Sequence, residues 1–253
     1  MSFVCPNTRP QLVVMAKVAE QCERYDEMLV CMKKVVKMQP VLSLEEKNLL
    51  SVAYKNVVGA RRAPWRTLAA LEQKAVRDTA QLAIIRQMKD RMEVEIAEVV
   101  NDLLKLTIEL IKNAADAESK VFYFKLQGDY HRYHVEVLPA NATAAQATAA
   151  AEEAYKQATA IASAELPVCS PIRLGLALNF SVFLYEIRKA MEDGYEMAKG
   201  AFEAAIPKLD DLKDDDYRES ATIMSLLRDN LNTWADALNI APDKGDDMAM
   251  EDC

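Results

Sequence analysis

Hydrophobic residues recur along most of this chain at spacings of three and four, which is the period of one buried face of an α-helix. No segment shows the alternating pattern of a half-buried strand. Two periodic stretches, Leu44–Lys74 and Thr79–Lys112, are longer than ordinary helices. Natural breaks fall near four prolines, which are Pro40, Pro139, Pro167 and Pro207. The pattern predicts an all-α protein in which long antiparallel helices form a bundle or a helical array.

Two helix starts are marked by the spacing of a capping box. Ser43 precedes Glu46 by three positions, so each side chain can bond the backbone N–H of the other residue. Thr143 precedes Gln146 by the same spacing and opens an alanine-rich run. We therefore expect Ser43 and Thr143 to cap the two helices that follow them.

Composition favours a folded helical protein, because the 253 residues include only six glycines and nine prolines. No stretch reaches the roughly 18 uncharged apolar residues that a membrane span needs. The N-terminus lacks the pattern of a secretion signal. The five cysteines are scattered and form no CxxC pair, which favours free thiols in a reducing compartment. We expect a cytoplasmic protein, with the nucleus as a second location, that does not insert into membranes.

The net charge of −8 argues against general nucleic-acid binding, which needs a broad positive surface. One predicted helix nevertheless gathers cations. Lys55 and Arg62 are seven positions apart and share a face at a separation of about 10 Å, and Arg66 lies one turn further. Three neighbouring cations repel unless an anion or carboxylates neutralise them. A phosphate monoester, with about −1.5 to −2 charges and three acceptor oxygens, suits this stripe. Periodicity alone also fits a solvated basic face.

A second cluster of phosphate donors lies in the aromatic segment Lys120–Tyr133. Arg132 is next to Tyr133, and a guanidinium and a phenol hydroxyl can both donate hydrogen bonds to a phosphate. Gly128, one turn before Arg132, leaves room on that face for close packing or for a ligand. The second cluster makes a phosphate pocket a better interpretation than a solvated face.

Four segments resemble motifs of the 14-3-3 family and occur in the family's order. They are Lys47–Arg66, Ala117–Tyr123, Pro171–Phe183 and Tyr217–Trp234, and the resemblance covers about residues 12–236. It implies about nine antiparallel helices in a cup-shaped, dimeric subunit. We expect one domain at residues 1–240, and the charge pattern of the last residues predicts an acidic flexible tail at 241–253. The resemblance also implies an adaptor, not an enzyme, that clamps phosphoserine or phosphothreonine segments of client proteins.

The resemblance assigns roles to individual positions. It implies a phosphate pocket formed by Lys55, Arg62, Arg132 and Tyr133. It implies that an extended peptide is bonded through its backbone by Asn179 and Asn230, whose amides supply both a donor and an acceptor. It implies a groove wall formed by Lys125, Leu178, Val182, Glu186, Ile223, Leu226 and Trp234. Taken without the resemblance, the apolar stripe of the last helix also fits an ordinary core face, and the asparagines also fit structural amides.

The resemblance further implies a contact with a second copy or a related chain. Across it, Arg24 would pair with Glu95 and Glu27 with Arg91. Apolar contact is expected from Leu12, Ala16 and Met88. Exposed ion pairs contribute only about 0–1 kcal/mol each, so these pairs would set the register of the contact. Two unrelated sets of surface charges are the alternative interpretation.

Three departures from the family pattern bear on function. Thr222 and Thr233 stand where leucine is usual, so we expect a weaker apolar wall and an altered choice of clients. Pro64 stands where many members have a serine that can be phosphorylated, so we expect no control of the dimer through this position. Met88 replaces an aromatic residue at the expected dimer surface, where methionine adapts to irregular contacts.

Two other classes of function stay open. An enzyme has little support, because no Walker loop, dinucleotide fingerprint or HExxH motif appears. His131 and His134 are three positions apart and have no identifiable third metal ligand, so we expect no metal and no cofactor. The main alternative is a helical scaffold that binds unphosphorylated peptides, although such a scaffold has no need to bring four phosphate donors together.

Overall fold

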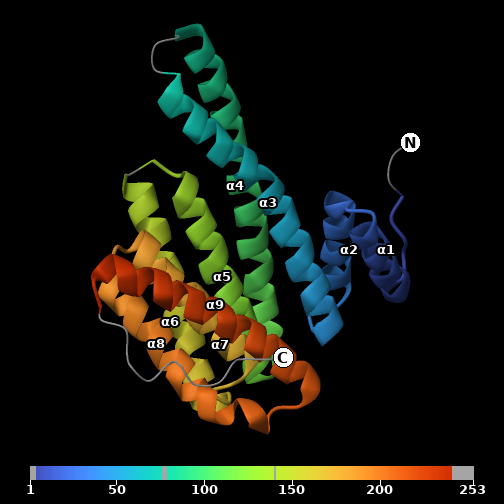
Figure 1. Cartoon of the computed structure of the whole chain (residues 1–253). Coiled ribbons are helices and arrows are strands. Elements are labelled where there is room, and N and C mark those ends of the chain that lie inside the picture. The colour runs from blue at the N-terminus through green and yellow to red at the C-terminus, as the bar shows by residue number, and fades with distance from the viewer. Residues whose placement is uncertain (1–3, 76–78, 140, 241–253) are drawn as a thin grey trace. The chain divides into compact units, whose positions relative to one another are not determined.

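The computed structural model describes residues 4–75, 79–139 and 141–240, and within these ranges it contains α-helices and no strand (Figure 1). The helices are α1 Arg9–Gln21, α2 Tyr25–Met38, α3 Leu44–Lys74, α4 Thr79–Asn113, α5 Ala117–Val137, α6 Ala142–Glu165, α7 Pro171–Val182, α8 Met191–Ala205 and α9 Asp214–Leu238. A π-helical turn, η1 (Phe183–Ile187), follows α7, and a 3₁₀ turn, η2 (Ile206–Asp211), follows α8. The all-α prediction is confirmed, and so are the two long helices. The expected acidic tail lies outside the described residues.

The chain forms two compact units, residues 1–158 and 159–253, whose boundary falls inside α6. In the first unit α1 packs on α2, α2 on α3, α3 on α4, and α4 on α5 (Figure 1). Its core is apolar and includes the fully buried side chains Leu12, Ala16, Met28, Met32, Leu50, Tyr54, Ile96 and Leu103. The expectation of a single domain over residues 1–240 stays a prediction.

The second unit consists of the end of α6 with α7, η1, α8, η2 and α9. Helices α7, α8 and α9 pack on one another around Leu174, Ala198, Met224, Leu227 and Trp234. The buried Ser220 hydroxyl of α9 donates to the Cys169 carbonyl at 2.7 Å. This bond joins α9 to the segment that leads into α7.

The predicted capping box at the start of α3 is confirmed. The Ser43 hydroxyl accepts from the Glu46 N–H at 3.2 Å, and the Glu46 carboxylate accepts from the Ser43 N–H at 2.9 Å. The prediction for Thr143 is wrong, because α6 begins at Ala142. The Asn141 side chain instead accepts from the N–H groups of Thr143 and Ala144, at 2.9 and 3.2 Å. The Asn141 oxygen thus caps the first N–H groups of α6 from two positions before Thr143.

Helix α3 continues through Pro64, whose side chain is exposed. Proline removes one backbone donor in a helix interior, and here the chain stays α-helical on both sides of it. Among the described helices, none is long and apolar enough to cross a membrane.

Candidate functional site

Two arginines of α3 converge on one carboxylate of α5 in the first unit. Arg62 reaches Glu136 with Nε at 2.8 Å and Nη2 at 2.6 Å. Arg66 Nε lies 2.5 Å from the other carboxylate oxygen. Burial alone would raise the pKa of Glu136, but the hydrogen bonds from Arg66 and Arg62 outweigh it and leave the pKa lowered. Glu136 is therefore an internal anion that pairs with both cations and neutralises half of their charge.

The ring of Tyr133 lies against both Arg62 and Arg132. The guanidinium carbon of Arg62 is 3.8 Å from the ring centroid, and that of Arg132 is 4.8 Å from it. Both distances allow a cation–π interaction. The structure therefore brings three of the four predicted phosphate-pocket residues together, from two different helices.

The buried carboxylate of Asp129 pairs with Arg132. Asp129 is 4% exposed, and one of its oxygens accepts from Arg132 Nη2 at 3.3 Å and from the Tyr155 hydroxyl at 2.6 Å. The other oxygen accepts from Lys125 Nζ at 3.0 Å. Burial alone would raise the pKa of Asp129, but Lys125, Arg132 and the Tyr155 hydroxyl leave it lowered. Asp129 thus stays ionised, and it orients a predicted pocket residue and a predicted groove residue.

Gly128 makes this network possible. A Cβ atom at Gly128 would lie 2.6–2.8 Å from three ring atoms of Tyr155. The fully buried Tyr155 ring therefore occupies the space that a side chain at position 128 would fill. Of the two uses foreseen for this glycine, close packing is the one that the structure contains.

Lys55 is exposed on α3, two turns before Arg62, and within the described part of the chain it makes no ion pair. The cluster instead contains Arg66, which was predicted only as part of the basic stripe. Three further members were missed: Asp129, Glu136 and Tyr155. A local signal existed for two of them, because Asp129 lies three positions before Arg132 and Glu136 four positions after it, spacings that place charges side by side on a helix.

The predicted groove residues of the second unit lie on α7, η1 and α9. Asn179 and Asn230 are half-buried, and the partly exposed Leu178, Val182 and Ile223 pack against the core of this unit. Leu226 is 48% exposed on α9. Glu186 is exposed in the π-helical turn, which sequence periodicity did not predict.

Trp234 differs from the other predicted wall residues because only 5% of it is exposed. Its ring stacks on Tyr185 with centroids 4.4 Å apart and planes 9° apart. The indole therefore stabilises the junction of η1 and α9 and has little surface left for a ligand. Thr222 and Thr233 are exposed on the same helix, and their hydroxyls donate to the carbonyls four residues earlier at 2.8 and 2.9 Å.

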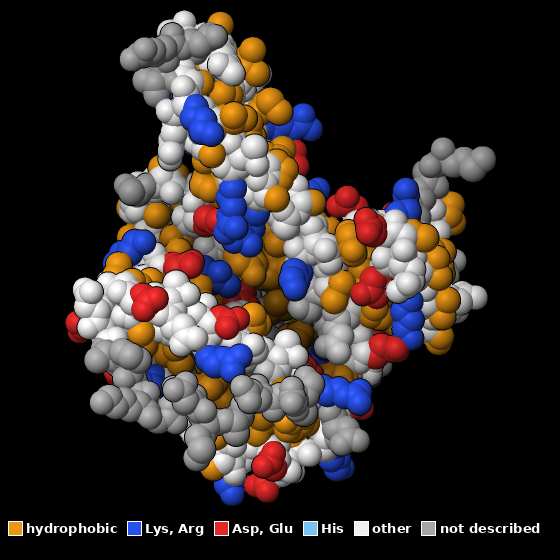
Figure 2. Space-filling model, in the orientation of Figure 1, with side chains coloured by type: hydrophobic (Ala, Val, Ile, Leu, Met, Phe, Trp, Pro, Cys, Tyr) orange, Lys and Arg blue, Asp and Glu red, His pale blue; other side chains and the backbone are white. Residues whose placement is uncertain are grey.

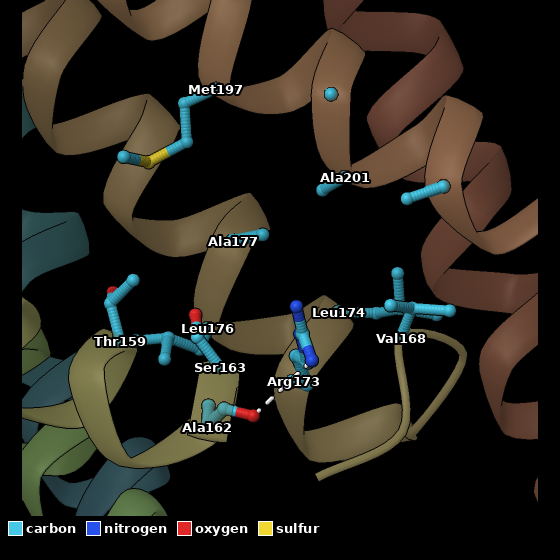
Figure 3. Close-up of a pocket in the computed structure, with 12 residues that line it drawn as sticks. Thr159, Ala162, Ser163, Val168, Arg173, Leu174, Leu176, Ala177, Met197 and Ala201 are labelled. Atoms are coloured by element: carbon cyan, nitrogen blue, oxygen red, sulfur yellow. Dashed lines mark hydrogen bonds between the residues drawn. The ribbon is translucent and has the colours of Figure 1, made fainter. Parts of the chain in front are cut away.

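A cavity of about 210 Å³ lies in the second unit, between the end of α6, α7 and α8 (Figure 3). Its lining is mostly small and apolar, and it includes none of the predicted groove residues. Figure 3 shows Arg173 within this lining, joined to the Ala162 carbonyl. Arg173 also donates to the Leu166 carbonyl at 2.7 Å. Arg173 therefore satisfies two carbonyls at the C-terminal end of α6.

The residues expected at a dimer contact differ in exposure. Leu12 and Ala16 are fully buried in the core of the first unit, so they have no surface to offer a partner, and their expected role is corrected. Their spacing of four placed them on one face of α1, and that face packs inward. Val14 and Val18, which are 60% and 53% exposed, are the apolar residues on the outer side of α1. Figure 2 shows hydrophobic side chains on the surface over this helix.

Met88 and the four charged residues of the expected contact are at the surface of α2 and α4 or their ends. Met88 is 54% exposed. The charges pair within the chain: Arg24 with Glu27, and Arg91 with Glu95 at 3.0 Å. Ion pairs across a dimer would replace these pairs within the chain, so their net contribution to the free energy of dimerisation would be small.

Basic side chains also follow α3 in the face that Figure 2 presents. The fold is all-α in its described residues, and its first unit contains a charged, partly buried cluster of arginines around a tyrosine. The chain matches the family model described as 14-3-3 protein over residues 15–235. It is 48% identical to 14-3-3 protein zeta of Xenopus laevis, over 88% of this chain and 91% of that protein. It is also 48% identical to 14-3-3-like protein GF14 psi of Arabidopsis thaliana, over 96% of each chain.

A third relative is the checkpoint signal transducer rad25 of Schizosaccharomyces pombe, which is 48% identical over 90% of this chain and 85% of that protein. The chain belongs to the 14-3-3 family, as its motifs predicted. It is therefore an adaptor and not an enzyme, with the general role of binding other proteins in signal transduction.

Proposed function

We propose that this chain is an adaptor that recognises phosphoserine or phosphothreonine in client proteins and clamps the surrounding segment. The observation that carries the proposal is the cluster in which Arg62 and Arg132 lie against Tyr133 and Arg66 joins Arg62 at Glu136. Three guanidinium groups and the ammonium group of Lys125 face two carboxylates, those of Glu136 and Asp129, so two positive charges are left over. Planar guanidinium groups pair bidentately with phosphate oxygens, which makes such a cluster a suitable phosphate site.

The second unit carries residues that suit an extended peptide. Asn179 and Asn230 suit the backbone of an extended peptide, and Leu178, Val182, Ile223 and Leu226 suit its apolar side chains. The two threonines of α9 reduce the apolar surface near Leu226, which supports an altered client preference. With a second copy or a related chain, two such sites would be held in one assembly, and a client with two phosphorylated segments would gain about 10²- to 10⁴-fold in avidity. We propose that the protein acts in the cytoplasm.

The test is a titration with a fluorescent peptide of the form Arg-Ser-x-phosphoSer-x-Pro and with its unphosphorylated twin. An Arg62→Ala/Arg132→Ala variant is expected to bind the phosphopeptide about 10²- to 10⁴-fold more weakly, because hydrogen bonds to charged groups contribute about 1.5–3 kcal/mol each. Arg62→Ala alone, which leaves the Asp129 network intact, should show part of the loss. Arg86→Ala is the matched control, since Arg86 pairs with Glu72 on the α3–α4 hairpin.

Circular dichroism would check that each variant is folded. Binding of only the phosphorylated peptide, lost in the double variant and kept in Arg86→Ala, supports the proposal. Equal binding of both peptides by wild type, indifferent to the arginines, would instead identify a scaffold for unphosphorylated segments.

A further inference from the structure

Glu136 pairs with two of the three guanidinium groups that the proposed function assigns to phosphate. Its carboxylate takes three hydrogen bonds, from Arg62 and Arg66, at 2.5–2.8 Å. The Glu136 side chain is 21% exposed, so its carboxylate has a path from the arginines into solvent. Arg66 is 61% exposed and Arg62 is 17% exposed, so the pair is open on one side. An incoming anion therefore meets arginines that already have an anionic partner.

We propose that the Glu136 carboxylate is an internal competitor of phosphate for Arg62 and Arg66, and that it must release both arginines before a phosphate can bind. This inference rests on the proposed function. Held on α5, the Glu136 carboxylate is present at a high effective concentration, like any tethered ligand. A client carboxylate offers the same charge and the same two oxygens, so it cannot displace Glu136. A phosphate offers more charge and a third acceptor oxygen, so it can. Because of Glu136, only strongly anionic groups can bind Arg62 and Arg66.

Removing the competitor should raise affinity. A Glu136→Gln variant is expected to bind the phosphopeptide about tenfold or more tightly than wild type. A peptide with glutamate in place of the phosphoserine should bind measurably to this variant and not to wild type. The opposite role, in which Glu136 only holds Arg62 and Arg66 in place for the ligand, predicts weaker phosphopeptide binding on the same substitution. The sign of the change therefore decides between the two roles.

Glu72→Gln is a closely matched control. Glu72 also bridges two cations, Arg86 and Lys89, at 2.8 and 2.7 Å, and its side chain is 22% exposed. The substitution changes the net charge equally, so it measures the general effect of removing one negative charge. An unchanged or weaker affinity in Glu136→Gln, while wild type binds the phosphopeptide, overturns the competitor role alone. If neither wild type nor Glu136→Gln binds the phosphopeptide, the proposed function fails and the competitor role fails with it.

A separate observation concerns two cysteines of the first unit. The Sγ atoms of Cys5 and Cys31 are 3.6 Å apart. Cys31 is fully buried on α2, whereas Cys5 is half-buried in the segment before α1. A disulfide needs a separation of about 2.05 Å, so closure requires a shift of roughly 1.5 Å. Cys5 lies outside any helix, so its backbone is not held by helical hydrogen bonds.

We propose that Cys5 and Cys31 form a disulfide when the protein meets a peroxide. Hydrogen peroxide oxidises the Cys5 thiol to a sulfenic acid with release of one water. The Cys31 sulfur then attacks the Cys5 sulfur, and the departing hydroxyl leaves with the Cys31 proton as a second water. Two thiols and one peroxide thus become one disulfide and two waters. Burial raises the pKa of Cys31 to about 12, which leaves the more accessible Cys5 as the group that peroxide meets first.

The disulfide would tie the segment before α1 to α2 and close a loop that contains α1. Treatment of the full chain with hydrogen peroxide, followed by peptide mass mapping without reduction, should reveal a Cys5–Cys31 linked peptide. The oxidised protein should melt about 5–10 °C higher than the reduced protein. Cys5→Ser should abolish both effects, and Cys22→Ser, which removes an exposed thiol instead, should keep them. Recovery of Cys5 only as a sulfinic acid or in links between chains would overturn the proposal.

Discussion

An Asp129→Ala variant should lose about 3–5 kcal/mol of its free energy of unfolding, because removing one partner of a buried charge pair leaves the others uncompensated. Asp129 is 4% exposed and accepts hydrogen bonds from Arg132, Lys125 and Tyr155. Without its carboxylate, Arg132 and Lys125 would remain largely buried with no anion beside them. The measurement is denaturant unfolding of both proteins, followed by circular dichroism.

Asp26→Ala is the control for this substitution. Asp26 also faces an arginine, Arg61, at 3.5 Å, but its side chain is 79% exposed. An exposed pair contributes about 0–1 kcal/mol, so this variant should unfold close to wild type. Equal losses in the two variants would mean that burial does not decide the contribution of these pairs. Asp129→Ala should also weaken phosphopeptide binding, because Arg132 would lose the group that orients it.

The Asp129 pair also has a defined dependence on pH. The pKa of Asp129 is lowered in the folded protein, against about 3.9 in an unfolded chain. Its stabilising contribution is therefore complete above the unfolded value and is lost as the pH falls through the folded pKa. The difference in stability between wild type and Asp129→Asn should accordingly be largest near neutral pH and shrink below about pH 4. A difference that stays constant down to pH 2 would contradict this assignment.

Features that depend on a few neighbouring residues were predicted well from the sequence. The α3 capping box needs only Ser43 and Glu46, and the bounds of α3 follow from it and from the hydrophobic period. The α6 start was missed by two positions because Asn141 and Thr143 are both good caps, and spacing alone favoured the one with a glutamine three residues later. The choice between them depends on the path of the chain before the helix.

Features that depend on packing were predicted only through the family resemblance, or not at all. Arg62 and Glu136 are 74 positions apart, and the local sequence around either residue does not predict that they pair. Leu12 and Val14 are both apolar residues of α1, but one is fully buried and the other is 60% exposed. Helical spacing identifies residues that share a face. It does not determine which face packs inward when both carry apolar residues, and this is the physical reason for the correction at α1.

Replacing Gly128 with alanine should destabilise the protein by about 1–3 kcal/mol, which is typical when a methyl group is forced into a packed core. The new Cβ would lie within 2.6–2.8 Å of the Tyr155 ring, so the ring or the helix must move. Tyr155 cannot move freely, because its ring is fully buried and its hydroxyl donates to Asp129 at 2.6 Å. A shift of Tyr155 would disturb Asp129 and through it Arg132. We therefore expect weaker phosphopeptide binding together with the loss of stability.

Gly59 provides a control in which the same substitution should act in the opposite direction. It lies inside α3, and a Cβ at this position would meet no atom within 4 Å. Alanine is favoured over glycine in a helix interior by about 0.5–1 kcal/mol, so Gly59→Ala should stabilise the protein slightly. Thermal melts of the two variants would test the pair together. Opposite shifts in melting temperature would show that the effect at Gly128 comes from the Tyr155 ring. If both substitutions stabilise the protein, the ring relaxes at little cost, and close packing is not the reason for a glycine at position 128.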